Sequence, residues 1–228
     1  EALAGRRIGS VARRAKNIVM DTGGEFLLVN LGMTGRLFIV QEGSASITHP
    51  GVRFRLADGR ELLYHDVRRF GRLWRMSPGE WRAWEGKLGV EPLSDDFSAK
   101  WLYEATRRSR VAVKVWLMDQ KRVVGVGNIY ASEALFRAGV HPERSVARLS
   151  PARWQRLAES LVAVLAQAIA EGGTTLNDFA DGEGNAGEFQ VSLGVYGREG
   201  EECPRCGRPV RRRVQAGRST FYCPACQR

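Results

Sequence analysis

The chain has 228 residues, 43% of them hydrophobic, which is enough to bury the cores of two modest domains, or of one domain with an appendage. Lysine and arginine number 35 against 25 aspartate and glutamate residues, so the formal net charge is +10. Such an excess favours a polyanionic partner, because neutralising phosphates releases counterions, although a merely cationic surface is the alternative. The sequence holds no run of about 18 apolar residues and no visible signal peptide, which excludes a membrane-spanning helix.

The first eighty residues predict β-strands separated by tight turns. The first two strands flank Gly23-Gly24, as the arms of a hairpin do. The clearest hairpin turns at Asp58-Gly59, because Asp-Gly supplies the positive φ that a tight turn needs. The expected strands are 18–21, 26–31, 36–40, 52–56, 61–65 and 70–76.

Beyond residue 80 the pattern becomes helical. One helix is expected at 129–138. Another starts after Ser150, a good N-cap residue, with Pro151 at its first position, and it ends at the glycine pair 172–173. Its apolar residues recur at helical spacing: Trp154, Leu157, Leu161, Val164, Leu165, Ala168 and Ile169.

All four cysteines lie near the carboxyl end, as two C-x2-C pairs separated by sixteen residues. Each pair fits a tight turn with both sulfurs facing one metal, and two such turns close a tetrahedron of thiolates around zinc. Four protein ligands leave no position for water, so the zinc is expected to be structural. Two redox motifs or four unrelated buried cysteines are the alternatives. The ligands would be Cys203, Cys206, Cys223 and Cys226.

The stretch between the cysteine pairs predicts a hairpin with Ala216-Gly217 at or near its tip. No acidic residue follows Cys203, and guanidinium groups match phosphate oxygens well. Most of the arginines here are expected to be generic contacts or solvated surface. They are Arg205, Arg208, Arg211, Arg212, Arg213, Arg218 and Arg228.

Four long motifs now resemble one family, in the right order along essentially the whole chain. They are 31–37 (LGMTGRL), 66–71 (DVRRFG), 116–133 (WLMDQKRVVGVGNIYASE) and 217–228 (GRSTFYCPACQR). Together they look like formamidopyrimidine-DNA glycosylase, the bacterial enzyme that removes 8-oxoguanine and ring-opened purines.

The resemblance implies an α+β multidomain fold. We expect an amino-terminal β-sandwich over 1–80, incomplete at its start, and a helix-two-turn-helix domain over 81–196. A zinc finger with four cysteine ligands, over 197–228, completes the chain. The implied partner is double-stranded DNA carrying oxidised bases or abasic sites, and a monomer is the default. A bacterial cytoplasm, in association with the nucleoid, is the expected location.

The family's nucleophile is the amine of an amino-terminal proline, which a glutamate follows. The present sequence opens at a point that resembles a position a few tens of residues inside the family's chain. Glu1 is therefore not expected to be the catalytic glutamate. We expect the 228 residues to lack the nucleophile and, by themselves, the family's normal chemistry.

Two catalytic roles carry over by resemblance. Lys16 matches the lysine regarded as the proton donor for β-elimination, although from the residues alone it would be one more phosphate contact. Arg218 matches the finger arginine linked to δ-elimination and to gripping the phosphates beside the lesion.

Met33, Arg68 and Phe70 match the trio that fills the gap left when the damaged nucleotide is flipped out. Extrusion costs a few kcal/mol of stacking and pairing, which inserted side chains offset in part. Without the resemblance Met33 and Phe70 would be assigned to a core, although their flanking glycines fit loop tips better.

Further positions match DNA contacts. Asn128 matches a phosphate-binding residue at the start of the second helix of the helix-two-turn-helix, with a plain N-cap as the alternative. His49 and Lys114 match positions that contact DNA, and Arg108 and Arg110 flank the place of a DNA-binding lysine.

The glycine-rich segment 181–189 corresponds to the loop that closes over the everted base, although such composition suits any loop. Asn30 departs from the histidine usual before Leu-Gly-Met, which puts one DNA contact in doubt.

Three functional hypotheses follow. The leading one is a bifunctional glycosylase and abasic-site lyase that acts on oxidised purines through a Schiff base and cuts the strand by successive β- and δ-eliminations. An endonuclease VIII-like enzyme for oxidised pyrimidines is the nearest rival. A non-catalytic binder of damaged DNA is the prediction for the 228 residues alone.

Overall fold

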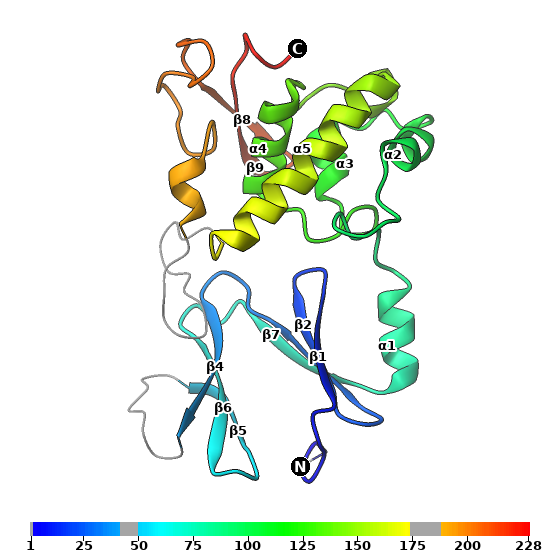
Figure 1. Ribbon diagram of the computed structural model, residues 1–228, viewed down its shortest axis with the longest axis vertical. Helices are drawn as coiled ribbons and strands as arrows, with labels where there is room; N and C mark the ends of the chain where they lie inside the picture. Colours follow the sequence, from blue (N-terminus) through cyan, green and yellow to red (C-terminus); the bar gives the residue numbers. More distant parts are fainter. Residues whose placement is uncertain (1, 42–49, 174–187) are drawn as a thin grey trace. The chain divides into compact units, whose positions relative to one another are not determined.

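The computed structural model describes residues 2–41, 50–173 and 188–228. The chain forms two compact units, coloured along the sequence in Figure 1. Unit 1 consists of Glu1–Gly86 and Glu171–Gln190, and unit 2 of Lys87–Ala170 and Val191–Arg228.

Unit 1 is a β-sandwich, as expected. One antiparallel sheet has the order β1-β2-β3-β7, and the other has the order β4-β6-β5. Met20, Leu27 and Val29 of the first sheet share a buried core with Leu62 and Tyr64 of the second. The strands are β1 (Ser10–Arg14), β2 (Asn17–Asp21), β3 (Phe26–Asn30), β4 (Gly35–Gln41), β5 (Pro50–Arg55), β6 (Arg60–Asp66) and β7 (Arg72–Met76).

Both predicted hairpins are confirmed. β2 pairs with β3 across a turn that contains Gly23 and Gly24, both at positive φ, and β5 pairs with β6 across Gly59 at φ 79°. Two details differ from the expectation. β1 was not located from the sequence, and β7 starts at Arg72 rather than at Phe70, because the Gly71 amide donates to the Asp66 carboxylate instead of entering the sheet.

Helix α1 (Pro78–Glu85) follows the sandwich and belongs to unit 1. Ser77 and Glu80 form a reciprocal capping box at its start, which satisfies two backbone amides. Trp81 stacks on Phe26 of β3 with ring centroids 5.2 Å apart. The first turn of the helix is therefore fixed both by its own cap and by a ring contact with the sandwich.

Unit 2 is helical around an aromatic core. Trp116 and Trp154 are both buried and meet edge to face at 6.1 Å. The predicted helices at 129–138 and after Ser150 are confirmed, and α5 lies across α4 in Figure 1. The helices are α2 (Ala99–Thr106), α3 (Val113–Met118), α4 (Asn128–Ala138) and α5 (Pro151–Ala170), with short 3-10 turns η1 (Val146–Arg148) and η2 (Phe189–Ser192), the latter divided between the two units.

The predicted finger hairpin is also confirmed. β8 (Arg211–Gln215) pairs with β9 (Arg218–Tyr222), and the tip residues Ala216 and Gly217 have φ of 48° and 73°. Two successive positive φ values suit the right-handed twist of a two-residue hairpin. Among the helices that the structure describes, none has the length and apolar character needed to cross a bilayer.

Candidate nucleic-acid interface and zinc centre

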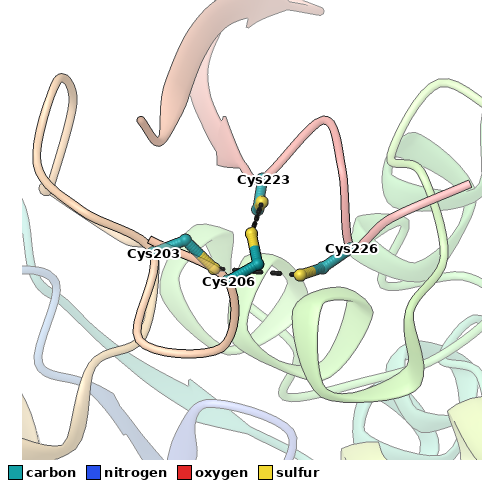
Figure 2. Close-up of side chains that lie close together, drawn as sticks. All are labelled: Cys203, Cys206, Cys223 and Cys226. Atoms are coloured by element: carbon teal, nitrogen blue, oxygen red, sulfur yellow. Dashed lines mark hydrogen bonds between the residues drawn. The ribbon is translucent and has the colours of Figure 1, made fainter. Parts of the chain in front are cut away.

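The four cysteines converge on one point, as Figure 2 shows. Their Sγ atoms all lie within 4.8 Å of one another, with 3.6 Å between Cys206 and Cys223 and 3.9 Å between Cys203 and Cys226. Zinc–thiolate bonds of about 2.3 Å place the sulfurs of a tetrahedral site about 3.8 Å apart. The four thiols therefore fit one structural zinc ion.

Backbone hydrogen bonds shape both cysteine turns. The Gly207 amide donates to the Cys203 carbonyl at 2.9 Å, and the Gln227 amide donates to the Cys223 carbonyl at 3.0 Å. The buried Gln227 side chain also accepts from the Cys223 amide and donates to the carbonyl of Val140, just after α4. The zinc centre is thus tied to the helical part of unit 2.

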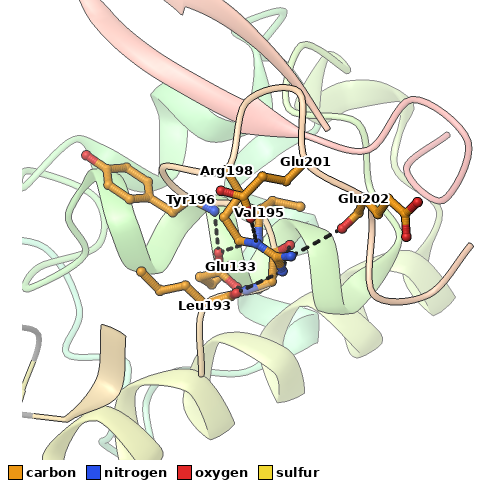
Figure 3. Close-up of polar contacts among 8 residues, drawn as sticks. Glu133, Leu193, Val195, Tyr196, Arg198, Glu201 and Glu202 are labelled. Carbon is orange, nitrogen blue, oxygen red and sulfur yellow. Dashed lines mark hydrogen bonds and ion pairs between the residues drawn. The ribbon is translucent and has the colours of Figure 1, made fainter. Parts of the chain in front are cut away.

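A buried carboxylate holds the segment that leads into the finger (Figure 3). Glu133 of α4 is 1% exposed, and its oxygens accept from the amides of Gly194, Val195 and Tyr196 at 2.8–3.0 Å. Three amides satisfy a buried negative charge that would otherwise be costly. Glu133 therefore fixes the path of the chain between α4 and the zinc finger.

Lys114 and Asn128 form a second junction between the helices and the finger. The Lys114 ammonium, 1% exposed, donates to the Asn128 Oδ1 atom, to the Ser219 carbonyl and to Thr220 Oγ1. Asn128 Nδ2 also donates to the Ser219 carbonyl at 2.9 Å. Burial, and then the charge of Arg218, lower the pKa of Lys114 to about 8.

The helix that Asn128 opens is capped by its neighbour. Gly127 occupies the N-cap of α4, so the plain N-cap interpretation of Asn128 is wrong. The Asn128 side chain instead turns toward the finger, because Lys114 and the Ser219 carbonyl together satisfy both ends of its amide. A buried lysine and an amide side chain thus occupy the junction where two DNA contacts were expected.

Three of the seven finger arginines have guanidinium groups for which the described residues supply a carbonyl or carboxylate partner. Arg205 donates to the carbonyls at 136 and 137, the last turn of α4, at 2.9 and 3.0 Å. Arg212 pairs with Glu199 and Arg213 with Glu143. These carboxylates lie before Cys203 in the chain, so the acid-free stretch could not reveal the pairs. Arg218 is exposed next to the hairpin tip.

Met33, Arg68 and Phe70 stand on two neighbouring loops of unit 1. Met33 is 61% exposed and Phe70 is 58% exposed, and the Arg68 guanidinium lies 4.8 Å above the Phe70 ring. Exposed apolar side chains that gather in one place mark interaction surfaces, and a guanidinium over an aromatic ring is a favourable contact. The loops thus present an apolar wedge, Met33 and Phe70, with the Arg68 guanidinium against it.

Lys16 is exposed in the two-residue turn between β1 and β2, beside Ala15 at φ 54°. Asn30 connects this turn to the Met33 loop. Its Nδ2 donates to the Lys16 carbonyl at 3.1 Å, and its Oδ1 accepts from the Gly32 amide at 3.0 Å. The departure at Asn30 therefore has a structural role that the sequence did not reveal.

The remaining predicted residues are spread along the chain. Arg108 and Arg110 are exposed in the turn after α2, where the Ser109 amide donates to the Thr106 carbonyl. His49 lies outside the described residues, as does segment 181–187 of the predicted lesion loop.

Sequence reasoning missed the buried carboxylates Asp66 and Glu133, although both lie within the quoted motifs. A charge among core positions was the available signal. Glu133 stands between Ala131 and Ala134, which are buried on the same helix.

Comparison with known families covers most of the chain. Three family models match: the Formamidopyrimidine-DNA glycosylase N-terminal domain at residues 1–73, the Formamidopyrimidine-DNA glycosylase H2TH domain at 88–180, and the Zinc finger found in FPG and IleRS at 200–228. A formamidopyrimidine-DNA glycosylase of Thioalkalivibrio sulfidiphilus is 48% identical over 100% of this chain and 84% of its own length. The chain belongs to the formamidopyrimidine-DNA glycosylase family.

Solved structures agree with this assignment. The MutM (Fpg) protein of Thermus thermophilus is 44% identical, with a TM-score of 0.88 over 99% of this chain and 85% of that one. The Lactococcus lactis Fpg in complex with DNA containing an abasic site is 32% identical, with a TM-score of 0.89 over 98% of this chain and 83% of that one. The α+β fold, the helix-two-turn-helix domain and the zinc finger are therefore confirmed.

Proposed function

We propose that this glycosylase inserts Met33, Arg68 and Phe70 into duplex DNA where a damaged nucleotide has left the stack. The exposed wedge with its cation is the observation that carries the proposal. Apolar side chains that enter the gap offset lost stacking, and the guanidinium faces the orphaned base. The Lactococcus lactis relative has been solved with abasic and Fapy-dG DNA, which supports the same class of partner here.

Membership of this family makes the protein a base-excision-repair DNA glycosylase with abasic-site lyase activity, acting on oxidised purines. In this chemistry an amine displaces the base at C1′, and the C1′–O4′ bond then breaks, with a proton going to O4′, to leave a Schiff base. The Schiff base permits β- and δ-elimination of the flanking phosphates. Lys16 acts as the proton donor in β-elimination, and its exposed turn gives it access to DNA. Arg218, exposed on the finger, grips phosphates beside the lesion and serves δ-elimination.

The other predicted DNA-binding residues act in two ways, by direct contact with DNA or by positioning the finger that contacts it. Arg108 and Arg110 meet the phosphate backbone directly, because both are exposed. Asn128 and Lys114 act indirectly, because both side chains donate to the Ser219 carbonyl and so position the finger backbone there. The DNA role of His49 and the closure of loop 181–189 over the base stay part of the proposal on resemblance alone.

The domain division that serves this function is 1–80, 81–196 and 197–228. The zinc ion holds the finger that carries Arg218. We place the protein in a bacterial cytoplasm, on the nucleoid DNA, as a monomer. The net charge of +10 supports binding to such a polyanion.

Borohydride trapping on duplex DNA with 8-oxoguanine opposite cytosine tests the proposal, with a gel shift on the same duplex. A covalent adduct and a cut strand support the lyase and would overturn the expectation that these 228 residues lack the nucleophile. Retarded DNA without an adduct would limit these 228 residues to binding damaged DNA, and the absence of retardation would contradict the interface. Comparing release of 8-oxoguanine with release of thymine glycol distinguishes the oxidised-purine enzyme from an endonuclease VIII-like one.

A further inference from the structure

Asp66 joins the two loops that carry the wedge. It is the last residue of β6, is buried, and accepts from Thr34 Oγ1 on one oxygen. Its other oxygen accepts from the Gly71 amide at 2.7 Å and from Tyr64 Oη at 3.0 Å. Thr34 ends the Met33 loop, and Gly71 ends the loop of Arg68 and Phe70, so one carboxylate binds both.

Thr34 also takes part in this link, and the hydrogen bonds of Asp66 and Thr34 between the two loops are called the lock below. While its hydroxyl donates to Asp66, the same oxygen accepts from the Arg68 amide at 3.3 Å. A hydroxyl can donate and accept at once, which no apolar side chain of the same shape can do. Thr34 therefore links the backbone that positions Arg68 to the carboxylate that ends the strand.

The backbones of the two loops also touch. Gly32 has φ +63°, and a Cβ there would lie 2.7 Å from the Gly71 nitrogen. A pocket of about 220 Å³ adjoins the lock and is lined by Thr34, Arg36, His65, Val67 and Arg68. Where the loops border this pocket, the hydrogen bonds of Asp66 and Thr34 hold them.

We infer that Asp66, through Thr34, is the positioning residue that fixes Met33, Arg68 and Phe70 in the geometry for insertion. The inference rests on the proposed function of those three side chains. Held loops lose less conformational freedom when they enter DNA, so the preformed wedge distinguishes damaged from undamaged duplex. Asp66 itself touches no DNA in this assignment.

The charge of Asp66 suits the role. Burial raises its pKa, but hydrogen bonds from Thr34, Gly71 and Tyr64 outweigh burial and lower the pKa below its ordinary value. The carboxylate therefore accepts with both oxygens at neutral pH. An alanine at this position would leave the Gly71 amide and two hydroxyls without their acceptor.

The test compares Thr34→Val, Thr34→Ser and Asp66→Ala with the parent chain. Binding of each to two duplexes that differ only in a tetrahydrofuran abasic analogue is followed by fluorescence anisotropy. A 2-aminopurine opposite the analogue reports stacking by inserted side chains. Thr22→Val is the matched control, because Thr22 is another buried threonine whose hydroxyl holds a turn of unit 1.

We expect Thr34→Val and Asp66→Ala to bind the abasic duplex about 10-fold more weakly, with less than about twofold change on undamaged DNA. The 2-aminopurine signal should lose its response in both variants. Thr34→Ser should retain both properties, as should Thr22→Val. A melting temperature above the assay temperature shows that a variant is folded during the assay. If Asp66→Ala does not fold, Thr34→Val alone tests the inference.

A Met33→Ala/Phe70→Ala double variant separates the role of the wedge in DNA binding from the positioning role of Asp66 and Thr34. If it binds the abasic duplex as the parent does, the proposed function of the wedge is wrong. If it loses that binding while folded Thr34→Val keeps it, the wedge stands and the positioning role of Asp66 and Thr34 is overturned.

Discussion

The Lys114 ammonium donates to Thr220 Oγ1 at 2.7 Å, across 106 positions of sequence, and so joins helix α3 to strand β9 of the finger. The same nitrogen reaches Asn128 and the Ser219 carbonyl. A single buried cation thus organises the place where α3, α4 and the finger meet. Lys114, which resembles a DNA contact in sequence, therefore lies away from solvent.

The stability of unit 2 should depend on pH through Lys114. The pKa of Lys114 is about 8 in the folded chain, against an ordinary 10.5, because of burial and then of Arg218. Between these values the unfolded chain binds more protons, so the free energy of unfolding contributed by Lys114 rises with pH over that window. An NMR titration of the Lys114 side chain should show a midpoint near 8, and Arg218→Gln should raise it. A midpoint near 10.5 in the parent chain would contradict this.

Zinc removal should expose all four thiols together. With the ion bound, a thiol reagent should find no reactive cysteine, because the chain's four cysteines form the one cluster. A chelator strong enough to strip the ion should release four thiols and one zinc per chain and lower the melting temperature. Cys223→Ser should purify without stoichiometric zinc. Reactive thiols in zinc-loaded protein would argue for separate redox pairs.

Glu133→Gln should destabilise unit 2 by about 1–3 kcal/mol. Glutamine replaces one carboxylate oxygen with an NH2 group, so a donor would face a backbone amide that donates to an oxygen in the parent chain. Glu143→Gln is the matched control. Glu143 forms an exposed ion pair with Arg213, and loss of such pairs costs about 0.2–1 kcal/mol. Urea denaturation measures both variants. Equal losses would mean that the three amides do not depend on the Glu133 charge.

Gly32→Ala should cost at least about 2 kcal/mol more than Gly59→Ala. Both glycines have positive φ, so both substitutions carry the same conformational penalty. Only at Gly32 would the new Cβ meet backbone, at 2.7 Å, whereas at Gly59 nothing lies within 4 Å. Melting temperatures of the two variants give the comparison, and similar values would show that the loop contact at Gly32 yields easily.

Arg218→Gln should weaken DNA binding and reduce the slope of log affinity against log salt by about 1, as the loss of one phosphate contact does. Arg213→Gln provides the control on the same hairpin, because Arg213 already pairs with Glu143 at 2.9 Å. Its salt slope should remain that of the parent chain. Anisotropy titrations at several salt concentrations measure both, and identical slopes for both variants would remove Arg218 from the phosphate interface.

Local patterns sufficed for much of the fold. Asp58-Gly59 and Ala216-Gly217 placed two hairpins, because positive φ is decided within a turn. Ser150-Pro151 placed the start of α5, since capping depends on neighbouring residues. The C-x2-C pairs indicated the zinc ligands in the same way, from the reach of each turn and the chemistry of thiolates.

Tertiary structure alone decided which charged residues are buried supports and which are exposed. Lys114 and Arg218 both resembled basic DNA contacts in sequence, yet one is enclosed by the finger and the other stands next to its tip. In sequence Asp66 was only the first residue of a motif, whereas in the folded chain Thr34 and Gly71 donate to its two carboxylate oxygens. Local signals act between chain neighbours, whereas the desolvation and pairing of a charge depend on groups that lie far away along the chain.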